Sequence, residues 1–505
     1  MTEQNQEPIK SQEQEPETQD RISVTQHTIK IGGKTINYTA TAGTIVIKEE
    51  IEANDKDKDK EKSKGETPKA SIFFVYYAQK KPEGISEGDH RQRRPITFAF
   101  NGGPGSSSVW LHLGLLGPRR VLTDNDGNPP PPPYKLVDNA YSLLDITDLV
   151  FIDPVSTGYS RVVPGEKPEQ FHNFQKDIES VGEFIRLFAT RYQRWTSPKF
   201  LIGESYGTTR AAGLSGYLQE HFGMYLNGVM LISSILNFQT ARFTPGNDLP
   251  FILFLPSYTA TAWYHKRLPS DLQKDLQTTI KQVEEFAMND YTLALMQGDA
   301  LPKEQRLSIA EQLARYTGLT IEYIQSTNLR INIYRFVKEL LRDERRTIGR
   351  LDSRFKGIDR DAAGEHFEFD PSYAAIQGLY TATLNDYRRS ELDFESDLPY
   401  EILTDRVQPW HFDQHQNQYV NVAETLRNAI SVNPTLQVFV ANGFYDLATP
   451  FLATKYTFNH MELDPSLKGN IKLEYYEAGH MMYIHTPSLR KLKQDLATFI
   501  NPTQV

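Results

Sequence analysis

The chain contains 505 residues and carries a net charge of −9, from 55 Lys and Arg against 64 Asp and Glu. This length fits a large α/β enzyme with one core and an insertion, or about three separate domains. The acidic balance argues against a nucleic-acid-binding protein, which needs a dominant basic surface. Because the chain has no cysteines, disulfides, iron–sulfur clusters, thiolate zinc sites and cysteine nucleophiles are excluded.

The amino-terminal segment is strongly polar. Residues 1–20 include five Glu and five Gln, so they bury too little apolar surface to offset the entropy of ordering. We predict a disordered tail over residues 1–21. This segment has no apolar stretch typical of a secretory signal, and apolar runs such as 251–255 are too short to span a bilayer. We expect a cytoplasmic protein without a membrane partner, or a periplasmic or secreted one only if an upstream signal is missing.

Short β-branched and aromatic runs follow the tail. They occupy residues 28–31, 35–38, 44–47 and 71–77. Runs of this kind, broken by glycines between residues 31 and 35, are typical of antiparallel hairpins. Residues 53–69 alternate Asp and Lys and offer nothing to bury, so we predict a flexible charged loop there.

From residue 95 the apolar runs become nearly continuous. They are ITFAF (96–100), DLVFID (148–153), KFLIG (199–203), GVMLIS (228–233), LQVFVA (436–441) and IKLEYY (471–476). Strands that are covered by helices on both faces have this pattern. Segments with helical spacing, such as 177–191 and 208–219, separate several of them. The alternation predicts an α/β fold with a doubly wound sheet.

Residues 241–420 interrupt this alternation. The stretch 270–345 is rich in Leu, Glu, Lys, Arg and Gln at helical spacing and has no strand signal. We therefore predict a mostly helical insertion, or cap, over 241–420. The α/β pattern resumes near Gln437, so residues 22–240 and 421–505 are expected to form a single core.

The strongest local motif is GESYG at residues 203–207. It fits G-x-S-x-G and lies between a predicted strand and a predicted helix, where a tight turn projects the serine hydroxyl above the sheet edge. The flanking glycines remove side chains that would clash in this turn. We predict that Ser205 is a nucleophile, and the alternative is a purely structural turn.

A serine hydroxyl needs a base to take its proton. Downstream, Asp446 and His480 each follow a predicted strand and a glycine, in the order that α/β-hydrolases use for acid and base. Asp446 would orient the imidazole, and His480 would act as the general base. His485 is the competing base, although it lacks the turn directly after the strand. A loop-capping aspartate and a structural histidine are the alternative interpretations.

A glycine-rich loop, NGGPGSSS, follows the strand at 96–100. Its backbone N–H groups are free to approach a substrate oxygen, and the N–H of Tyr206, directly after the nucleophile, would be the second donor to an oxyanion. A phosphate-binding loop would need Gly-Lys-Ser/Thr at fixed spacing, which is absent. The G-x-G-x-x-G fingerprint of nicotinamide-binding proteins is absent from this position too.

Five motifs together make the pattern specific. NGGPGSSS, DPVSTGYS at 153–160, GESYG, NGFYDLATP and AGHMMY resemble the serine carboxypeptidase family, and they occur in that family's order between about residues 96 and 490. The chain looks like a bacterial-type member without cysteines. The resemblance implies an α/β-hydrolase fold and release of C-terminal residues from peptides that carry a free terminal carboxylate.

The same resemblance implies a role for individual residues. It implies a catalytic triad and two oxyanion donors, namely Ser205, Asp446 and His480 with the N–H groups of Gly103 and Tyr206. It also implies that three residues hold the terminal carboxylate of the substrate, namely Asn101, Glu204 and the N–H of Gly102. Two carboxylates at hydrogen-bond distance cannot both stay ionised, so Glu204 would bind substrate in its protonated form and favour acidic pH. The alternative is that Glu204 points away to a salt bridge.

The chain departs from the family pattern at two positions. Family members commonly carry a second glutamate after the glycine loop, and the matching position here is Leu115. Many members have a cysteine where this chain has Ser106, and they are secreted, a property that is not carried over here. Without the second glutamate, the pKa of Glu204 depends on other neighbours.

No cofactor or metal is predicted. His411 and His415 have helical i, i+4 spacing, but Phe412 stands where the H-E-x-x-H motif has its glutamate. Two other functions keep the same fold. An esterase or acyltransferase would use the same triad with another leaving group or acceptor, and a non-catalytic scaffold would not react with a serine-directed fluorophosphonate.

Overall fold

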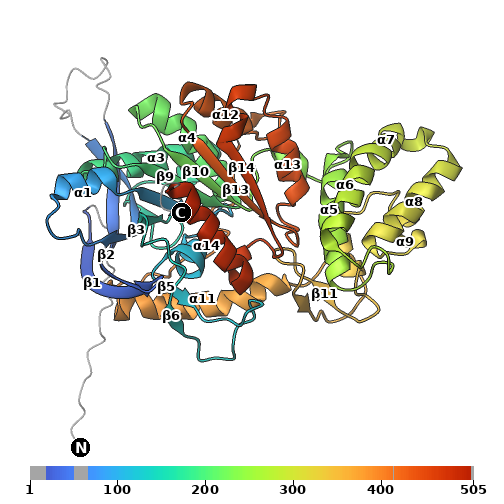
Figure 1. Ribbon diagram of the computed structural model, residues 1–505, viewed down its shortest axis with the longest axis horizontal. Helices are drawn as coiled ribbons and strands as arrows, with labels where there is room; N and C mark the ends of the chain where they lie inside the picture. Colours follow the sequence, from blue (N-terminus) through green and yellow to red (C-terminus); the bar gives the residue numbers. More distant parts are fainter. Residues whose placement is uncertain (1–18, 51–65, 413–414, 502–505) are drawn as a thin grey trace, which may run out of the picture.

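A mixed β-sheet runs through the centre of the protein (Figure 1). The computed structural model describes residues 19–50, 66–412 and 415–501. Within these ranges the central sheet has ten strands, in the order β1-β2-β3-β7-β4-β9-β10-β13-β14 with β8 beside β3. The strands of this sheet are β1 (Ile22–Ile31), β2 (Lys34–Glu50), β3 (Glu66–Gln79), β4 (Ile96–Phe100), β7 (Asp148–Ile152), β8 (Arg161–Val162), β9 (Lys199–Glu204), β10 (Gly228–Ile232), β13 (Gln437–Gly443) and β14 (Ile471–Tyr476).

The sheet has a parallel and an antiparallel part. Strands β7, β4, β9, β10, β13 and β14 pair in parallel, whereas β1, β2 and β3 pair antiparallel to one another and join the edge of β7. This arrangement confirms the predicted α/β sheet with amino-terminal antiparallel hairpins. All parallel strands end at one edge, so the loops after them meet there.

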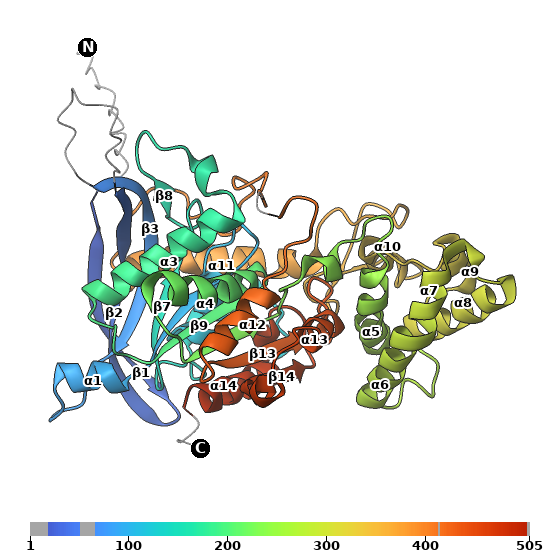
Figure 2. The same ribbon diagram turned by 90° about the horizontal axis from the view of Figure 1, so that it is seen from above.

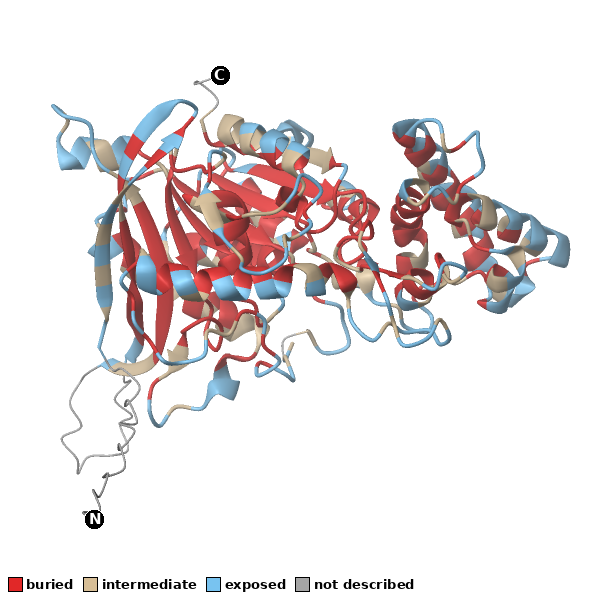
Figure 3. Ribbon diagram, turned by 90° about the horizontal axis from the view of Figure 1, so that it is seen from below, coloured by how far each residue is buried: buried red, intermediate tan, exposed pale blue. Residues whose placement is uncertain are grey.

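Helices cover both faces of the sheet. The helices are α1 (Glu87–Arg93), α2 (Val109–Leu111), α3 (Phe174–Arg191), α4 (Tyr206–Phe222), α5 (Leu249–Tyr264), α6 (Leu276–Phe286), α7 (Thr292–Gln297), α8 (Lys303–Thr317), α9 (Ile321–Ser326), α10 (Ile333–Glu339), α11 (Pro371–Ser390), α12 (Ala423–Val432), α13 (Phe451–Asn459) and α14 (Thr486–Ile500). Helices α3, α4 and α12 pack in one core, and α11 and α14 pack in the other (Figure 2). Adjacent strand residues face opposite cores, as Phe98 and Ala99 do in β4. Figure 3 shows that most of the strands are buried.

The amino-terminal strands are longer than the sequence pattern suggested. The predicted runs at 35–38 and 44–47 belong to one 17-residue strand, β2. The predicted tail over 1–21 and the predicted loop over 53–69 lie mostly outside the described residues. The described end of the tail contacts the core, since Asp20 Oδ1 accepts a hydrogen bond from Val46 N at 2.9 Å. Residues 66–69 of the predicted loop are already part of β3.

The chain between β10 and β13 has two parts. Helices α5–α10 form a lobe with a core of its own at one end of the molecule (Figures 1 and 2). Helix α11 instead packs against the sheet through its apolar face, with Leu379, Leu384 and Tyr387 in the main core. Two short hairpins complete the fold, β5 (Arg119–Val121) with β6 (Leu136–Asp138) and β11 (Thr347–Ile348) with β12 (Lys356–Gly357). The range predicted as one insertion is thus shared between the lobe and the core.

A buried ion network fixes the sheet edge opposite the catalytic motifs. Asp148, at the start of β7, accepts hydrogen bonds from Arg94 Nε at 2.7 Å and from Arg194 Nη1 at 2.5 Å. Burial acts to raise the pKa of Asp148, but the two guanidinium groups outweigh it and leave that pKa below its ordinary value. No helix in the described ranges is both long and apolar enough to cross a membrane.

Arg194→Met should strongly destabilise the protein. The substitution leaves the buried Asp148 carboxylate with one guanidinium partner instead of two, and breaking a buried ion pair costs about 3–5 kcal/mol. The matched control is Arg191→Met, because Arg191 pairs with Asp20 at the surface and exposed pairs contribute about 0–1 kcal/mol. Urea unfolding followed by circular dichroism measures both, and equal losses would contradict the importance of the buried network.

Candidate active site

The predicted site residues follow the carboxyl ends of four parallel strands. Asn101 follows β4, Ser205 follows β9, Asp446 follows β13 and His480 follows β14. A pocket of about 750 Å³ opens at this edge. Most of the predicted residues line it, namely Asn101, Gly102, Gly103, Glu204, Ser205, Tyr206 and His480. The sheet topology therefore gathers residues that lie up to 379 positions apart in the sequence.

Ser205 occupies a strained turn between β9 and α4. Its backbone has φ 60° and ψ −129°, a conformation that is costly for a residue with a side chain and that clusters at functional sites. Neither flanking glycine has room for a side chain. A Cβ on Gly203 would lie 2.1 Å from the carbonyl oxygen of Gly207, and a Cβ on Gly207 would lie 2.7 Å from the carbonyl oxygen of Phe100. This is the geometry that presents a nucleophilic hydroxyl above a sheet edge.

The glycine-rich loop lies directly against this turn. A Cβ on Gly102 would lie 2.4 Å from the backbone nitrogen of Tyr206. Gly103 has φ 102°, in the region that favours glycine. Tyr206 is the first residue of α4, so its N–H has no acceptor within the helix. Both N–H groups of the predicted oxyanion hole thus belong to residues that line the same pocket as Ser205.

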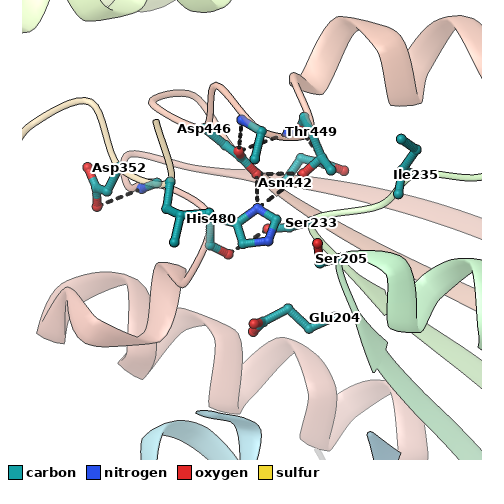
Figure 4. Close-up of polar contacts among 12 residues, drawn as sticks. Glu204, Ser205, Ser233, Ile235, Asp352, Asn442, Asp446, Thr449 and His480 are labelled. Atoms are coloured by element: carbon teal, nitrogen blue, oxygen red, sulfur yellow. Dashed lines mark hydrogen bonds and ion pairs between the residues drawn. The ribbon is translucent and has the colours of Figure 1, made fainter. Parts of the chain in front are cut away.

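His480 and Asp446 form a buried pair beside Ser205 (Figure 4). His480 Nδ1 lies 2.7 Å from Asp446 Oδ2, which assigns the proton to Nδ1 and leaves Nε2 free to accept one. Asp446 is fully buried, and its Oδ1 accepts hydrogen bonds from the backbone of Ala448 and Thr449 at 2.7 and 3.0 Å. Thr449 Oγ1 donates to Oδ2 at 2.6 Å. The carboxylate is therefore held in one orientation.

This environment also sets the protonation of His480. Burial acts to lower its pKa, but the charge of Asp446 and the hydrogen bond from Nδ1 outweigh burial and leave the pKa above its ordinary value. A carboxylate that stabilises the imidazolium in this way is what a general base requires when it takes a serine proton.

Glu204 is buried in the pocket wall and pairs with Asn101. Asn101 Nδ2 donates a hydrogen bond to Glu204 Oε1 at 2.9 Å, and Asn101 Oδ1 accepts one from Leu111 N at 3.1 Å. Burial raises the pKa of Glu204 to about 7. Glu204 has no salt bridge to a basic side chain in the described part of the chain, so the alternative interpretation, in which Glu204 points away to a salt bridge, is not supported.

Of the remaining sequence candidates, Ser106 lines the pocket, whereas His485 and Leu115 lie outside it. His485 contacts Ser488 at the start of α14 at 2.8 Å and does not line the pocket. Leu115 is buried in the main core. Ser106 accepts a hydrogen bond from the indole of Trp110 at 2.8 Å. In the described ranges no three His, Asp or Glu side chains are grouped to hold a metal ion.

Sequence reasoning missed a segment that supports both catalytic loops. Residues 350–354, from the range predicted as the cap, run alongside the loops that carry Asp446 and His480. His480 N donates to Leu351 O at 2.7 Å, and Leu447 N donates to Arg350 O at 3.1 Å. Ser353 N donates to Tyr445 O at 3.0 Å. We name residues 350–354 the bracing segment.

Asp352 is the central side chain of the bracing segment. Its Oδ2 accepts a hydrogen bond from Gly479 N at 3.2 Å (Figure 4). Its carboxylate also pairs with Arg354, and a Cβ on Gly479 would lie 2.4 Å from the Asp352 side chain. In the sequence, the only local sign of this contact between Asp352 and the His480 loop is the glycine at position 479.

Asp352→Asn should slow the chemistry at Ser205. The NH2 group that takes the place of Oδ2 cannot accept the hydrogen bond from Gly479 N, so the His480 loop is expected to shift, and misplacement of a catalytic group by about 1 Å costs about 100-fold. The rate of labelling by a fluorophosphonate measures this effect well below the melting temperature. Asp343→Asn, which alters a surface ion pair with Arg267 in the lobe, is the control. Equal labelling rates in both variants would show that Asp352 has only a structural role.

Comparison with known proteins identifies the family of this chain. The sequence profile of the serine carboxypeptidase family matches residues 63–487. The pheromone-processing carboxypeptidase KEX1 of Puccinia graminis f. sp. tritici is 30% identical over 128 residues, or 24% of this chain and 18% of the relative. KEX1 of Saccharomyces cerevisiae is 35% identical over 122 residues, or 22% of this chain and 15% of the relative. The matched segments thus span less than a fifth of these curated relatives.

A solved structure extends the likeness of fold to nearly the whole chain. It is the crystal structure of KEX1(delta)p, a prohormone-processing carboxypeptidase from Saccharomyces cerevisiae, with a TM-score of 0.53 and 16% identity. The superposition covers 92% of this chain and 91% of that chain. The sheet order and the helices on both faces are those of an α/β-hydrolase. Since the family profile also matches most of its length, the chain belongs to the serine carboxypeptidase family.

Proposed function

We propose that this protein is a serine-type carboxypeptidase that hydrolyses the last peptide bond of peptides with a free terminal carboxylate. The observation that carries the proposal is that one pocket contains both Ser205 with His480 and the buried pair of Asn101 with Glu204. The first pair supplies an acyl-transfer nucleophile and its base. The second supplies hydrogen-bond donors for a carboxylate, which a general esterase or acyltransferase does not need.

Acylation would begin at Ser205. Its Oγ attacks the carbonyl carbon of the last peptide bond while His480 Nε2 takes the hydroxyl proton. The N–H groups of Gly103 and Tyr206 would stabilise the negative oxygen of the tetrahedral intermediate. The C–N bond then breaks, the departing amine takes the proton from His480, and the terminal residue leaves. Asp446 would orient the imidazole and stabilise the imidazolium.

Deacylation would use the same groups with water as the nucleophile. His480 Nε2 takes a proton from the water, whose oxygen attacks the ester carbonyl of the acyl-enzyme. The C–O bond to Ser205 breaks, and His480 returns the proton to Oγ. The shortened peptide leaves with a new terminal carboxylate.

Substrate binding and catalysis would need opposite protonation states. Glu204 binds a carboxylate only when it carries a proton, and its pKa is raised to about 7 by burial. His480 works only when it is neutral, and its pKa lies above the ordinary value because of Asp446. Turnover of a peptide acid would therefore fall at low pH, where His480 is protonated, and at high pH, where Glu204 is ionised.

Ser205→Ala should abolish peptidase activity and leave the fold intact. Loss of the triad nucleophile costs roughly 10⁶-fold in turnover. Ser215→Ala, which removes a buried hydroxyl from the adjacent helix α4, should keep nearly full activity. Release of amino acids from a peptide library measures both variants and identifies the preferred terminal residue. Activity of Ser205→Ala within about tenfold of the wild type would refute the assignment.

The preference for a peptide acid over its C-terminal amide should fall as pH rises through about 7, where Glu204 loses its proton. The measurement is the ratio of kcat/KM for the acid to kcat/KM for the amide at each pH, because ionisation of His480 affects both substrates equally. Glu204→Gln should flatten the ratio, since its amide donates a hydrogen bond at every pH. A ratio that is independent of pH in the wild type would exclude Glu204 from the carboxylate site and favour an esterase.

A further inference from the structure

One arginine of the pocket has a side chain without a partner. Arg350, the first residue of the bracing segment, lines the same pocket as Ser205 and His480 and is half-buried. Within the described ranges, its hydrogen bonds all involve its main chain, and its guanidinium has no ion pair. A guanidinium offers five N–H donors and is always charged. An anion that enters the pocket would therefore meet an unused binding group.

The carboxylates next to Arg350 in the structure are already engaged. Asp352 pairs with Arg354. Asp370 accepts hydrogen bonds from the main-chain nitrogens of Arg350 and Leu351, each at 3.2 Å. Neither carboxylate forms an ion pair with the Arg350 guanidinium, so this group is left for a ligand rather than used to hold the fold together.

The main chain of Arg350 is fixed on both sides. Its nitrogen donates to Asp370 Oδ1, and its carbonyl oxygen accepts from Leu447 N at 3.1 Å. The carbonyl oxygen of the next residue, Leu351, accepts from His480 N at 2.7 Å. Arg350 is thus held close to the base, and a change of its side chain leaves these main-chain hydrogen bonds in place.

A continuous wall connects Arg350 with the proposed carboxylate site. Asn101 Oδ1 accepts a hydrogen bond from Leu111 N, and the residue before Leu111, Trp110, lines the pocket. The Trp110 ring contacts the Tyr373 ring, with centroids 6.0 Å apart. Tyr373 lies in the first turn of α11, and the N-cap of this helix binds the main chain of Arg350.

The terminal residue of the substrate would lie along this wall. Its carboxylate would be held by Asn101 and protonated Glu204, and its nitrogen would face His480, which gives the leaving amine its proton. Its side chain would then meet the wall between these two points. Apart from Arg350, the residues of this wall are uncharged, namely Trp110, Leu351, Tyr373, Ile376 and Gln377.

We propose that Arg350 makes this enzyme selective for peptides that end in an acidic residue, whose side-chain carboxylate pairs with the guanidinium. This inference rests on the proposed function, because it takes the terminal carboxylate to be held at Asn101 and Glu204. A guanidinium binds a carboxylate through two parallel hydrogen bonds, and such charge-assisted bonds are about twice as strong as neutral ones.

Further charged side chains of the pocket belong to other walls. Asp405 lies in the segment next to the glycine-rich loop, where Thr404 N donates to Gly105 O at 3.0 Å. Arg242 is exposed, and its guanidinium carbon lies 5.5 Å from the centroid of the Phe238 ring. Arg242 therefore offers a matched control, as a second arginine of the same pocket that is remote from the wall of α11.

The test compares two peptides that differ only in their last residue, glutamate or glutamine. The measurement is the ratio of their kcat/KM values at about pH 6, where the glutamate side chain is ionised and Glu204, with a pKa of about 7, still holds its proton. The wild type should favour glutamate by about tenfold or more, as expected for hydrogen bonds between charged groups.

Arg350→Gln should bring this ratio close to one. Arg350→Lys should keep part of the preference, because it keeps the charge and loses the planar fork, and it carries the test if Arg350→Gln does not fold. Arg350→Glu should instead favour a peptide that ends in lysine. Labelling of Ser205 by a fluorophosphonate shows that each variant retains a folded site. Arg242→Gln should leave the glutamate-to-glutamine ratio at its wild-type value.

Two results would overturn this inference alone. One is a wild-type ratio near one, or a ratio that Arg350→Gln does not change. The other is a loss, in Arg350→Gln, of the preference for the acid over the amide of a leucine-terminated peptide, which would show that Arg350 binds the terminal carboxylate itself. A wild-type enzyme that releases no terminal residue from any peptide would instead overturn the proposed function, so the two failures are distinguishable.

Discussion

Contact between two backbones, with no room for a side chain between them, is the constraint on which the site depends. The glycine loop after β4 touches the turn after β9 so closely that a Cβ atom at Gly102 or Gly207 would overlap main-chain atoms of the other segment. Parallel pairing of β4 with β9, in which Phe100 lies opposite Gly203, fixes this contact. It brings the N–H groups of the loop and of α4 to the same side as the Ser205 hydroxyl.

Asp446 and His480 come from the far side of β10. Strand β13 pairs with β10, and β14 pairs with β13; the loops after these two strands carry Asp446 and His480. These loops are longer than the turn between β9 and α4. Close contacts at glycines are therefore not enough to fix their positions. The bracing segment supports them through main-chain hydrogen bonds, and Thr261 of α5 contacts Ser353 at 2.6 Å. The positions of Asp446 and His480 therefore depend on a chain segment that belongs to neither strand.

Residues that come directly after a strand could be predicted from the sequence. Ser205, Asp446 and His480 each lie within a few residues of a continuous apolar run, so strand, turn and motif could be identified together. The bracing segment could not be found in this way, because Ser353 and Tyr445 are 92 positions apart and neither lies in a distinctive motif.

Other differences between the predicted and the observed elements could have been recognised in the sequence. The spacing of Ile376, Leu379, Leu384 and Tyr387 marks an apolar face of α11 that reaches the main core, although this helix lies in the range predicted as the cap. Strand β2 continues through Gly43, where a Cβ would overlap the carbonyl oxygen of Arg21. That glycine interrupts the pattern of β-branched residues without ending the strand.

The bracing segment has a consequence for protein engineering and for the divergence of this family. The α5–α10 lobe has its own hydrophobic core and resembles a module that could be exchanged for the lobe of another enzyme to change its substrates. The exchange must end before Arg350, because the residues beyond it are shared with the catalytic loops. A recombination point placed at β11, Thr347–Ile348, would keep the bracing segment with the host enzyme, whereas one placed after Arg354 would transplant part of the support of the loops that carry Asp446 and His480. The hydrogen bonds that cross the boundary of the lobe thus limit where the lobe can be exchanged.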